Sequence, residues 1–552
     1  MQRAKEAGDS ESWLGLVSSY CNQLKSSDDE NKLVAEFVAQ SNLVRAKSRT
    51  RTGRLWAAQQ IKGLVPSSLF ESCLLNHSDL STAFQLTEAC RARLLLDMMS
   101  NLYKPPGPAM ISQAAELEAR IFAYEPGTDQ SLVMQEMELM SLLPLINRGS
   151  ANRARLDDVN HLEALAVEGD WGFSGVATSP SLADIQKMLR PAEALIEYVE
   201  LRLHDGRPSY IALVVTGQRA QAVRLPVDLL SHDLVATIEV DGRQPIDSTA
   251  LGNAVANLRL AISDGSDEAA LPILRVLYEY LLKPLAEIDG MESVDHLVIV
   301  PTGFLHLIPW MALWAAANDP SVQQRAVSLI PSAAIWALVV SHSDRLPSSY
   351  MGMGDPKLQD RNLPRLKEAG REVKEFAERL GGWHVEVRTQ QDATKAEFLS
   401  LAPTAGVVHV ATHGDFPEMN PLDEHAFLLT PAPGDDGRLT ASQIAPMDLR
   451  WLGVALLNVC NGAVYRVGPG DEPYGLAAAM MTAGAQNIIA PLWPIADDFA
   501  RGAAVSLADD IISKTTLATA FTFAMNRLAV NAGMVDWAAY CLIGPGRELE
   551  WQ

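Results

Sequence analysis

The second half of the sequence alternates short apolar runs with amphipathic ones, and this order restricts the fold more than any other feature. Strand-like runs such as VVHVAT (407–412) and VALLNV (454–459) alternate with helix-like runs such as RLKEAGREVKEFAERLGG (365–382). The apolar runs lack the period of two that is typical of a strand with one face in water. Strands that are apolar on both faces and separated by helices form a parallel sheet covered on both sides. The sequence therefore predicts an α/β fold.

The spacing of apolar residues and the order of predicted elements change twice along the chain and divide it into three regions. Residues 1–189 repeat apolar positions every three or four residues, which predicts amphipathic helices and suggests helical hairpins. Residues 190–345 run strand, strand, helix, strand, as in half of an α/β sheet. Residues 346–552 restart the alternation and are expected to form the second half. A chain of 552 residues is too long for one ordinary core, which agrees with this division.

Composition excludes several classes of protein. The formal charge of −22 disfavours direct binding to nucleic acid or to an anionic membrane. The N-terminus has no apolar signal-peptide segment, and no later run is a convincing membrane span, so a cytoplasmic location is predicted. The five cysteines are scattered, without the close pairs of a zinc site or a disulfide framework. We expect no metal and no cofactor, and any cysteine with a chemical role would be a free thiol.

Two predicted strands end in reactive side chains. The run VVHVAT leads to His413 and Gly414, and the run VALLNV leads to Cys460. If these strands are parallel neighbours, both side chains lie at the same edge of the sheet, one or two strand spacings of about 5 Å apart. At that distance an imidazole can exchange protons with a thiol that attacks an acyl carbon.

A glycine beside the histidine fits the same chemistry. The backbone N–H groups of Gly414 and Cys460 would stabilise the oxyanion, and a side chain at position 414 would obstruct the approach of a carbonyl group. Simpler interpretations exist for each residue taken alone. A cysteine at a strand end is often a small buried hydrophobe. His409 and His413 have the spacing of a zinc helix, but the glutamate is missing and the segment is strand-like, so a metal site is not expected.

Several strings, in their order and spacing, resemble the CHAT domain, which is a caspase-like (clan CD) cysteine peptidase domain of the group that includes separase. They are VVHVATHGDF, NPLDEHAFLL, GRLTASQI, LLNVCNGA and WAAYCLIG, and the resemblance extends over about residues 190–545. It implies that His413 and Cys460 form a catalytic dyad. It also implies a degenerate caspase-like subdomain at 190–345, an active one at 346–552, and tetratricopeptide-like helices within 1–189.

The resemblance also bears on the substrate pocket. Many members have Ser-Ala-Cys-Glu-Thr around the nucleophile, whereas this chain has Asn458-Val459-Cys460-Asn461-Gly462. In separase-like members an acidic residue faces the P1 side chain, and the segment LWPIADD places Asp497 and Asp498 at that position. We therefore predict a preference for arginine or lysine at P1. Aspartate is also a common helix N-cap, which fits Asp498 better than Asp497. Trp493 would be a pocket wall or a core residue.

The segment that follows Cys460, AVYRVGPGDEPYGL, is rich in glycine and proline and is expected to be a mobile loop over the cleft. Its Glu472 lies near the start of the next predicted helix and is expected to stabilise the positive end of that helix, with a role in ordering the substrate loop as the alternative.

The predicted function is a cysteine endopeptidase that cleaves a protein partner. A regulatory protein or effector complex would dock on the N-terminal helices, and the family implies a setting in bacterial defence. One alternative is a scaffold that keeps the caspase-like shape without turnover, and another is a thiol hydrolase that acts on small molecules.

Overall fold

The computed structural model describes most of the chain from residue 27 to residue 552. The residues outside the description are 1–26, 65–79, 105, 108–109, 111, 115, 118–119, 121–148, 203–207, 227–249, 318–323, 342–344, 359–362, 417–424, 461, 464–465, 469–470 and 512–514.

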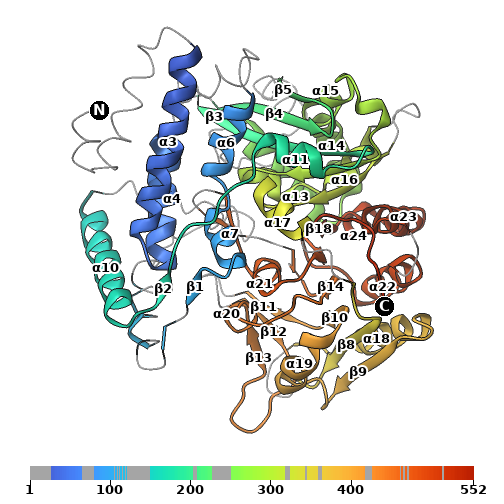
Figure 1. Ribbon diagram of the computed structural model, residues 1–552. Helices are drawn as coiled ribbons and strands as arrows, with labels where there is room; N and C mark the ends of the chain where they lie inside the picture. The colour runs from blue at the N-terminus through green and yellow to red at the C-terminus, as the bar shows by residue number, and fades with distance from the viewer. Residues whose placement is uncertain are drawn as a thin grey trace.

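The N-terminal region is helical, as predicted. Its described helices are α3 (Ser27–Lys47), α4 (Arg51–Leu64), α6 (Leu80–Ala89), α7 (Arg93–Met99), α10 (Gly149–Glu168) and α11 (Leu182–Met188). Helices α3, α4 and α10 stand beside the α/β part of the molecule, and α6 and α7 lie between them and the sheet (Figure 1). A left-handed residue, Ala92, separates α6 from α7, so the two are not one continuous helix. The short strands β1 (Tyr103–Lys104) and β2 (Gly172–Phe173) pair in this region.

A single sheet runs through the rest of the molecule. In spatial order it contains β5 (Ala220–Leu225), β4 (Pro208–Thr216), β3 (Glu193–Arg202), β6 (His296–Val300), β7 (Ala326–Leu329), β18 (Tyr540–Ile543), β17 (Asn487–Pro491), β14 (Val454–Asn458), β10 (Val407–Ala411), β8 (Ser349–Pro356) and β9 (His384–Gln390). The α/β class is confirmed. The sheet is not parallel throughout, because β4 is antiparallel to β3 and β5, and β18 is antiparallel to β17.

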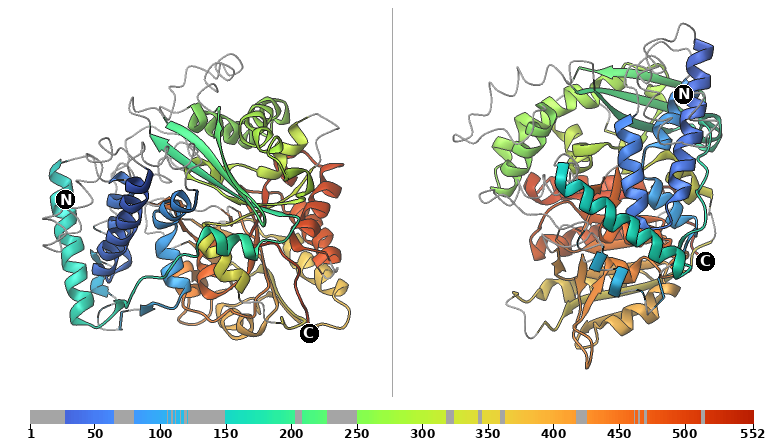
Figure 2. Two further views of the ribbon diagram at one scale, coloured as in Figure 1. Left: turned by 45° about the horizontal axis from the view of Figure 1, so that its top comes forward. Right: turned by 90° about the vertical axis from the view of Figure 1, so that its left-hand side faces the viewer.

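Helices and short elements cover this sheet, as two further views show (Figure 2). The first half carries α13 (Ala250–Ser263), α14 (Asp267–Leu281), α15 (Lys283–Ala286), η3 (Met291–Ser293), η4 (Gly303–Leu307), α16 (Trp310–Ala316) and α17 (Ala333–Ser341). The second half carries α18 (Lys367–Arg379), α19 (Lys395–Leu401), η5 (Ala402–Thr404), α20 (Ala441–Ile444), α21 (Leu476–Ala483), α22 (Asp497–Ile511), α23 (Leu517–Ala529) and α24 (Met534–Trp537). Small sheets are formed by β11 (Gly414–Asp415), β12 (Ala426–Leu428) and β13 (Arg438–Thr440), and by β15 (Arg466–Gly468) and β16 (Glu472–Tyr474).

The central strands are buried on both faces. Every residue of β10, β14 and β17 is buried, which explains why these runs lack a period of two. One apolar core continues through both halves of the sheet. Strand β18, the last in the sequence, joins the halves by lying between β17 and β7. Within the part of the chain that the structure describes, no helix has the length and apolar character needed to cross a membrane.

Candidate active site

The strands that lead to His413 and Cys460 are direct parallel neighbours. Residue Ala411 of β10 pairs with Asn458 of β14, and Thr412 N–H donates to the Asn458 carbonyl oxygen at 3.3 Å. His413 lies two residues beyond Ala411, and Cys460 lies two residues beyond Asn458. The two reactive residues therefore leave the same edge of the sheet at the same level.

The His413 ring is oriented by a backbone carbonyl group. Its Nε2 lies 2.7 Å from the carbonyl oxygen of Pro364, in the segment that precedes α18. A carbonyl oxygen only accepts hydrogen bonds, so Nε2 carries the proton and Nδ1 is the basic nitrogen of the neutral ring. This contact leaves Nδ1 as the atom that can take a proton from a thiol.

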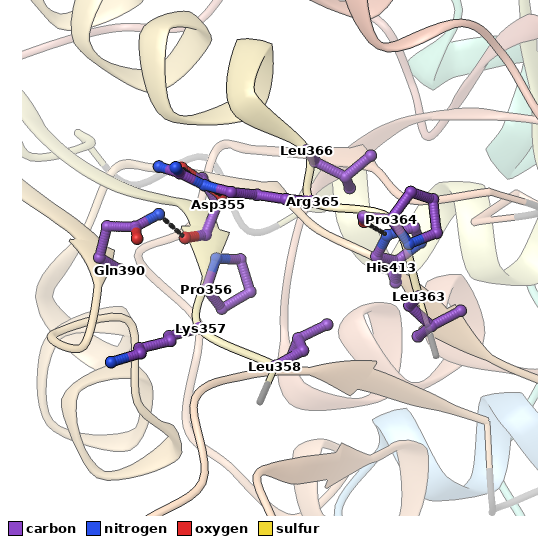
Figure 3. A pocket seen from close by; sticks show the side chains of 10 residues that line it. All are labelled: Asp355, Pro356, Lys357, Leu358, Leu363, Pro364, Arg365, Leu366, Gln390 and His413. Carbon is purple, nitrogen blue, oxygen red and sulfur yellow. Dashed lines mark hydrogen bonds and ion pairs between the residues drawn. The ribbon is translucent and has the colours of Figure 1, made fainter. Parts of the chain in front are cut away.

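A cavity of about 190 Å³ opens beside His413. Figure 3 shows His413 and Pro364 at one end of it, and Asp355 with Arg365 and Gln390 toward the other. The buried Asp355 carboxylate accepts two hydrogen bonds from Arg365 Nε, at 3.0 and 3.1 Å, and one from Nη2 at 2.7 Å. This bidentate pair holds the segment that contains Pro364 against the end of β8.

Asp355 is the next-to-last residue of a third strand at the same edge. Strand β8 pairs in parallel with β10 and with β9, and its register with β9 is interrupted between Gly354 and Pro356. Asp355 has a left-handed φ of 51° at this irregularity, a conformation that aspartate tolerates better than most side chains. Neither Asp355 nor Pro364 was predicted as a site residue from the sequence. The Gly-Asp-Pro triplet at the end of an apolar strand could have indicated Asp355. Pro364 contacts His413 through its backbone carbonyl group, which no side-chain pattern reveals.

Cys460 is half-buried at the end of the β14 segment. Burial raises the pKa of its thiol, while backbone groups of Ile495 and of Cys460 itself act in the opposite direction. A thiol with a raised pKa is mainly protonated near neutral pH, so it needs a base before it can attack a carbonyl carbon. The His413 ring is hydrogen-bonded to Pro364, and Cys460 lies near Ile495. Among the described contacts, no hydrogen bond joins the side chains of His413 and Cys460.

Gly414 fills a position with no room for a side chain. A Cβ atom there would lie 2.1 Å from a ring carbon of Phe416 and 2.7 Å from Cγ1 of Val459. Gly414 begins β11, and the neighbouring His413 carbonyl oxygen accepts a hydrogen bond from Leu428 N–H at 3.0 Å. The close packing explains the glycine, and the predicted role of its N–H in an oxyanion hole stays a prediction.

The structure places the three predicted pocket residues in different surroundings. Asp497 begins α22, and its carboxylate accepts hydrogen bonds from the backbone N–H groups of Glu368 and Ala369 at the start of α18. Asp498 is exposed and bonds to the N–H of Phe499 at 3.0 Å. Asp497 thus stabilises the start of a neighbouring helix, although the sequence favoured Asp498 as the helix-capping residue.

Trp493 lies in the core. It is 4% exposed, and its indole N–H donates to the Val535 carbonyl oxygen at 2.6 Å. This environment matches the interpretation of Trp493 as a core residue. Its role as a pocket wall stays a prediction, as do the substrate-binding roles of Asp497 and Asp498.

Glu472, in β16, connects the segment after Cys460 to the N-terminal helices. Its carboxylate accepts hydrogen bonds from Leu94 N–H at 2.6 Å and from Leu95 N–H at 3.1 Å, in the first turn of α7. The sequence had predicted that Glu472 stabilises the start of the helix that follows it, α21, and this was wrong. Burial raises the pKa of Glu472 to about 8.

The segment around Glu472 was predicted to be a mobile loop, and its described part is instead paired. Strands β15 and β16 form an antiparallel hairpin, and residues 471–474 are buried. The neighbouring Asp471 accepts hydrogen bonds from Thr302 Oγ1 at 2.7 Å and Gly303 N–H at 3.2 Å, and Arg91 lies 3.6 Å away. The hairpin is therefore fixed on one side to α7 and on the other to the first half of the sheet.

The site offers no obvious place for a metal ion. Among the described residues, no group of three or more His, Cys, Asp or Glu side chains has an arrangement that could hold one.

Residues 271–545 match the CHAT domain family. No curated protein sequence matches the chain.

Solved structures of two kinds of protein match the chain at low identity. The Saccharomyces cerevisiae separase–securin complex matches at 11% identity with a TM-score of 0.43, over 91% of this chain and 38% of the separase-complex chain. The Arg-specific cysteine proteinase gingipain R matches at 11% identity with a TM-score of 0.37, over 52% of this chain and 70% of that chain. A complex of Porphyromonas gingivalis RgpB pro- and mature domains matches at 10% identity and the same TM-score, over 52% and 72%. This chain thus spans well under half of the separase-complex chain. Its residues 271–545 match the CHAT domain, whose family model covers just under half of the chain.

Proposed function

We propose that the chain is a cysteine endopeptidase in which His413 and Cys460 form the catalytic dyad. The observation that carries the proposal is their common position at the ends of the paired strands β10 and β14, beside a cavity that His413 lines. The CHAT domain and the caspase-like fold support the same reaction class.

The reaction can be written with these residues. His413 Nδ1 takes the proton from Cys460, and Sγ forms a bond to the scissile carbonyl carbon. The negative oxygen that results is stabilised by backbone N–H groups, for which Gly414 and Cys460 are the proposed donors. The C–N bond then breaks, and His413 gives its proton to the leaving amine. Water, deprotonated by His413, attacks the thioester, the C–S bond breaks, and the proton returns to the thiol.

A substrate with arginine or lysine at P1 is part of the proposal. Burial raises the pKa of Asp497, and so do the nearby negative charges of Glu368 and Asp355. Three carboxylates therefore lie close together. Asp355 lines the cavity and pairs with Arg365, and Glu368 pairs with Arg371 and Arg501. Asp497 is therefore the proposed partner of a basic P1 side chain.

Regulation by a protein that docks on the N-terminal helices is the second part. Glu472 and Asp471 attach the hairpin after Cys460 to α7 and to the segment before it, so a displacement of α7 acts directly on the nucleophile's surroundings. The raised pKa of Cys460 favours low basal activity. A setting in bacterial defence and a cytoplasmic location remain predictions from the sequence.

The common position of His413 and Cys460 and the cavity beside them would also fit a scaffold without turnover. Covalent labelling of Cys460 distinguishes the scaffold from the peptidase. The protein is incubated with a thiol-reactive peptide ketone that carries arginine at P1, with and without the proteins that copurify with it. The peptidase predicts labelling of Cys460 that is lost in His413→Ala and absent in Cys460→Ala. Cleavage of a peptide library by the wild type, with Cys460→Ala as the blank, then gives the P1 preference. No labelling in the presence of a bound partner would favour the scaffold.

A further inference from the structure

A buried hydrogen bond lies directly behind the nucleophile. The Tyr540 hydroxyl donates to Asn458 Oδ1 at 2.7 Å, and the two residues are 2% and 7% exposed. Asn458 is the last residue of β14, two positions before Cys460. Tyr540 begins β18 and pairs with Pro491 at the end of β17. The pair therefore joins the end of the strand that leads to Cys460 to a strand two places away in the sheet.

The other end of the Asn458 amide is also fixed. Its Nδ2 donates to Glu372 Oε1 on α18 and to the Ala500 carbonyl oxygen, the latter at 3.3 Å. Glu372 Oε1 also lies 2.6 Å from Nε2 of His409, which is four residues before His413. One carboxylate thus ties the strand that leads to the imidazole to the strand that leads to the thiol.

Tyr540 also lies near Cys460 itself. Burial raises the pKa of Tyr540, and negative charge on Glu372 and on Cys460 adds to this effect. A negative charge on Cys460 therefore raises the pKa of the Tyr540 hydroxyl group. Tyr540 pairs with Pro491 at the end of β17, and Ile495, whose backbone contacts Cys460, lies four residues further along the chain. The segment after β17 therefore brings Tyr540 and Cys460 close together.

Asn458 contacts three other elements of the fold through its side chain. The asparagine side chain makes contacts with Tyr540, Glu372 and Ala500, which lie on β18, α18 and α22. Each of these contacts restrains the end of β14.

We propose that Tyr540 is a positioning residue for Cys460, acting through its hydrogen bond to Asn458. The proposal rests on the peptidase function proposed above. The hydroxyl holds the amide of Asn458, and the amide holds the end of β14, so that Sγ stays aligned with His413. Neither residue takes part in bond making or breaking.

The test compares two substitutions that remove the same atom. Tyr540→Phe removes the hydroxyl behind Cys460. Tyr198→Phe is the matched control, because Tyr198 is fully buried and its hydroxyl donates one hydrogen bond, to the Leu281 carbonyl oxygen at 2.8 Å, in the other half of the sheet. Both variants should lose a similar, small amount of thermal stability. Only Tyr540→Phe should lower kcat, by about tenfold with KM unchanged, which corresponds to a barrier raised by about 1.4 kcal/mol.

A second measurement does not depend on turnover. The rate of Cys460 alkylation by iodoacetamide at pH 7.5, with the labelling of Cys460→Ala subtracted, should fall about tenfold in Tyr540→Phe and stay unchanged in Tyr198→Phe. If no peptide is cleaved by the wild type but this difference is seen, the positioning role stands and the peptidase function fails. Equal alkylation rates in wild type and Tyr540→Phe, or equal losses in both variants, would overturn the proposal. If Tyr540→Phe does not fold, Asn458→Ser removes the same hydrogen bond and is judged by the same two measurements.

Discussion

Replacement of Glu472 by glutamine should change how the stability of the protein depends on pH. Burial raises the pKa of this carboxyl group to about 8, against an ordinary value of 4.5. Below pH 4.5 the group is protonated in both the folded and the unfolded chain, and ionisation has no effect on folding. Between pH 4.5 and 8 the unfolded chain has lost this proton and the folded chain keeps it, so the free energy of unfolding falls as pH rises. Above about pH 8 both forms are ionised and the loss is complete.

The size of the effect follows from the two pKa values. Their difference of about 3.5 pH units, at about 1.4 kcal/mol per unit, corresponds to about 5 kcal/mol of stability lost between the two limits. Glutamine cannot ionise, so the Glu472→Gln variant should lack this contribution. Its free energy of unfolding, measured by urea denaturation at pH 5, 6, 7 and 8, should fall less steeply than that of the wild type by about 1 kcal/mol per pH unit.

The slope is the decisive quantity, because the amide disturbs one of the two hydrogen bonds at every pH. Glutamine has one acceptor oxygen, whereas the carboxylate accepts from both Leu94 and Leu95. A constant loss of about 1 kcal/mol across the whole range is therefore expected in addition. The exposed Glu548 provides the control, since Glu548→Gln should leave the slope unchanged. Parallel curves for the wild type and Glu472→Gln would refute the reasoning.

Three further substitutions test the site. Gly414→Ala should lower kcat about 100-fold, because the new Cβ meets Phe416 and Val459 and displaces the proposed oxyanion donor; steady-state kinetics at near wild-type activity would contradict this. Asp497→Asn should lower the stability by about 1 kcal/mol through the start of α18, and should reduce cleavage after arginine relative to leucine; a lower Tm with an unchanged ratio would assign it to the helix alone. Asp355→Asn should lower kcat about tenfold, because the segment that holds His413 loses its ion pair, and peptide kinetics at equal folded concentration would measure this.

The elements of the sheet could be predicted from local patterns. Runs such as 407–411 and 454–458 are apolar except at His409 and Asn458, and their strands are buried on both faces. The alternation of such runs with helix-like runs in the second half of the sequence predicted a parallel sheet, and neighbouring parallel strands end at the same edge. The antiparallel β18 could not be predicted from its sequence, because its place depends on β17 and β7, which are separated from each other by more than 150 residues.

The partners of the buried carboxylates could not be predicted for the same reason. Glu472 is 378 residues from Leu94, and Asp497 is 129 residues from Glu368. A sequence pattern links a carboxylate to the nearest helix, which led to α21 for Glu472, whereas Asp497 was predicted to line the P1 pocket. The N–H groups at the start of any helix attract a carboxylate equally well, so only the fold decides which helix is closest.

The segments before and after Cys460 have different roles because their long-range contacts differ. Behind it, Asn458 and Tyr540 belong to the core, and their hydrogen bond ties the end of β14 to β18. After it, the β15–β16 hairpin is held by Glu472 on α7, in the helical region. A partner that displaces α7 would therefore shift the hairpin while the end of β14 stays in place. In such an arrangement activation changes access to the nucleophile and leaves its alignment with His413 unchanged. Accordingly, Glu472→Gln should change the response to a partner, whereas Tyr540→Phe should lower activity equally with and without one.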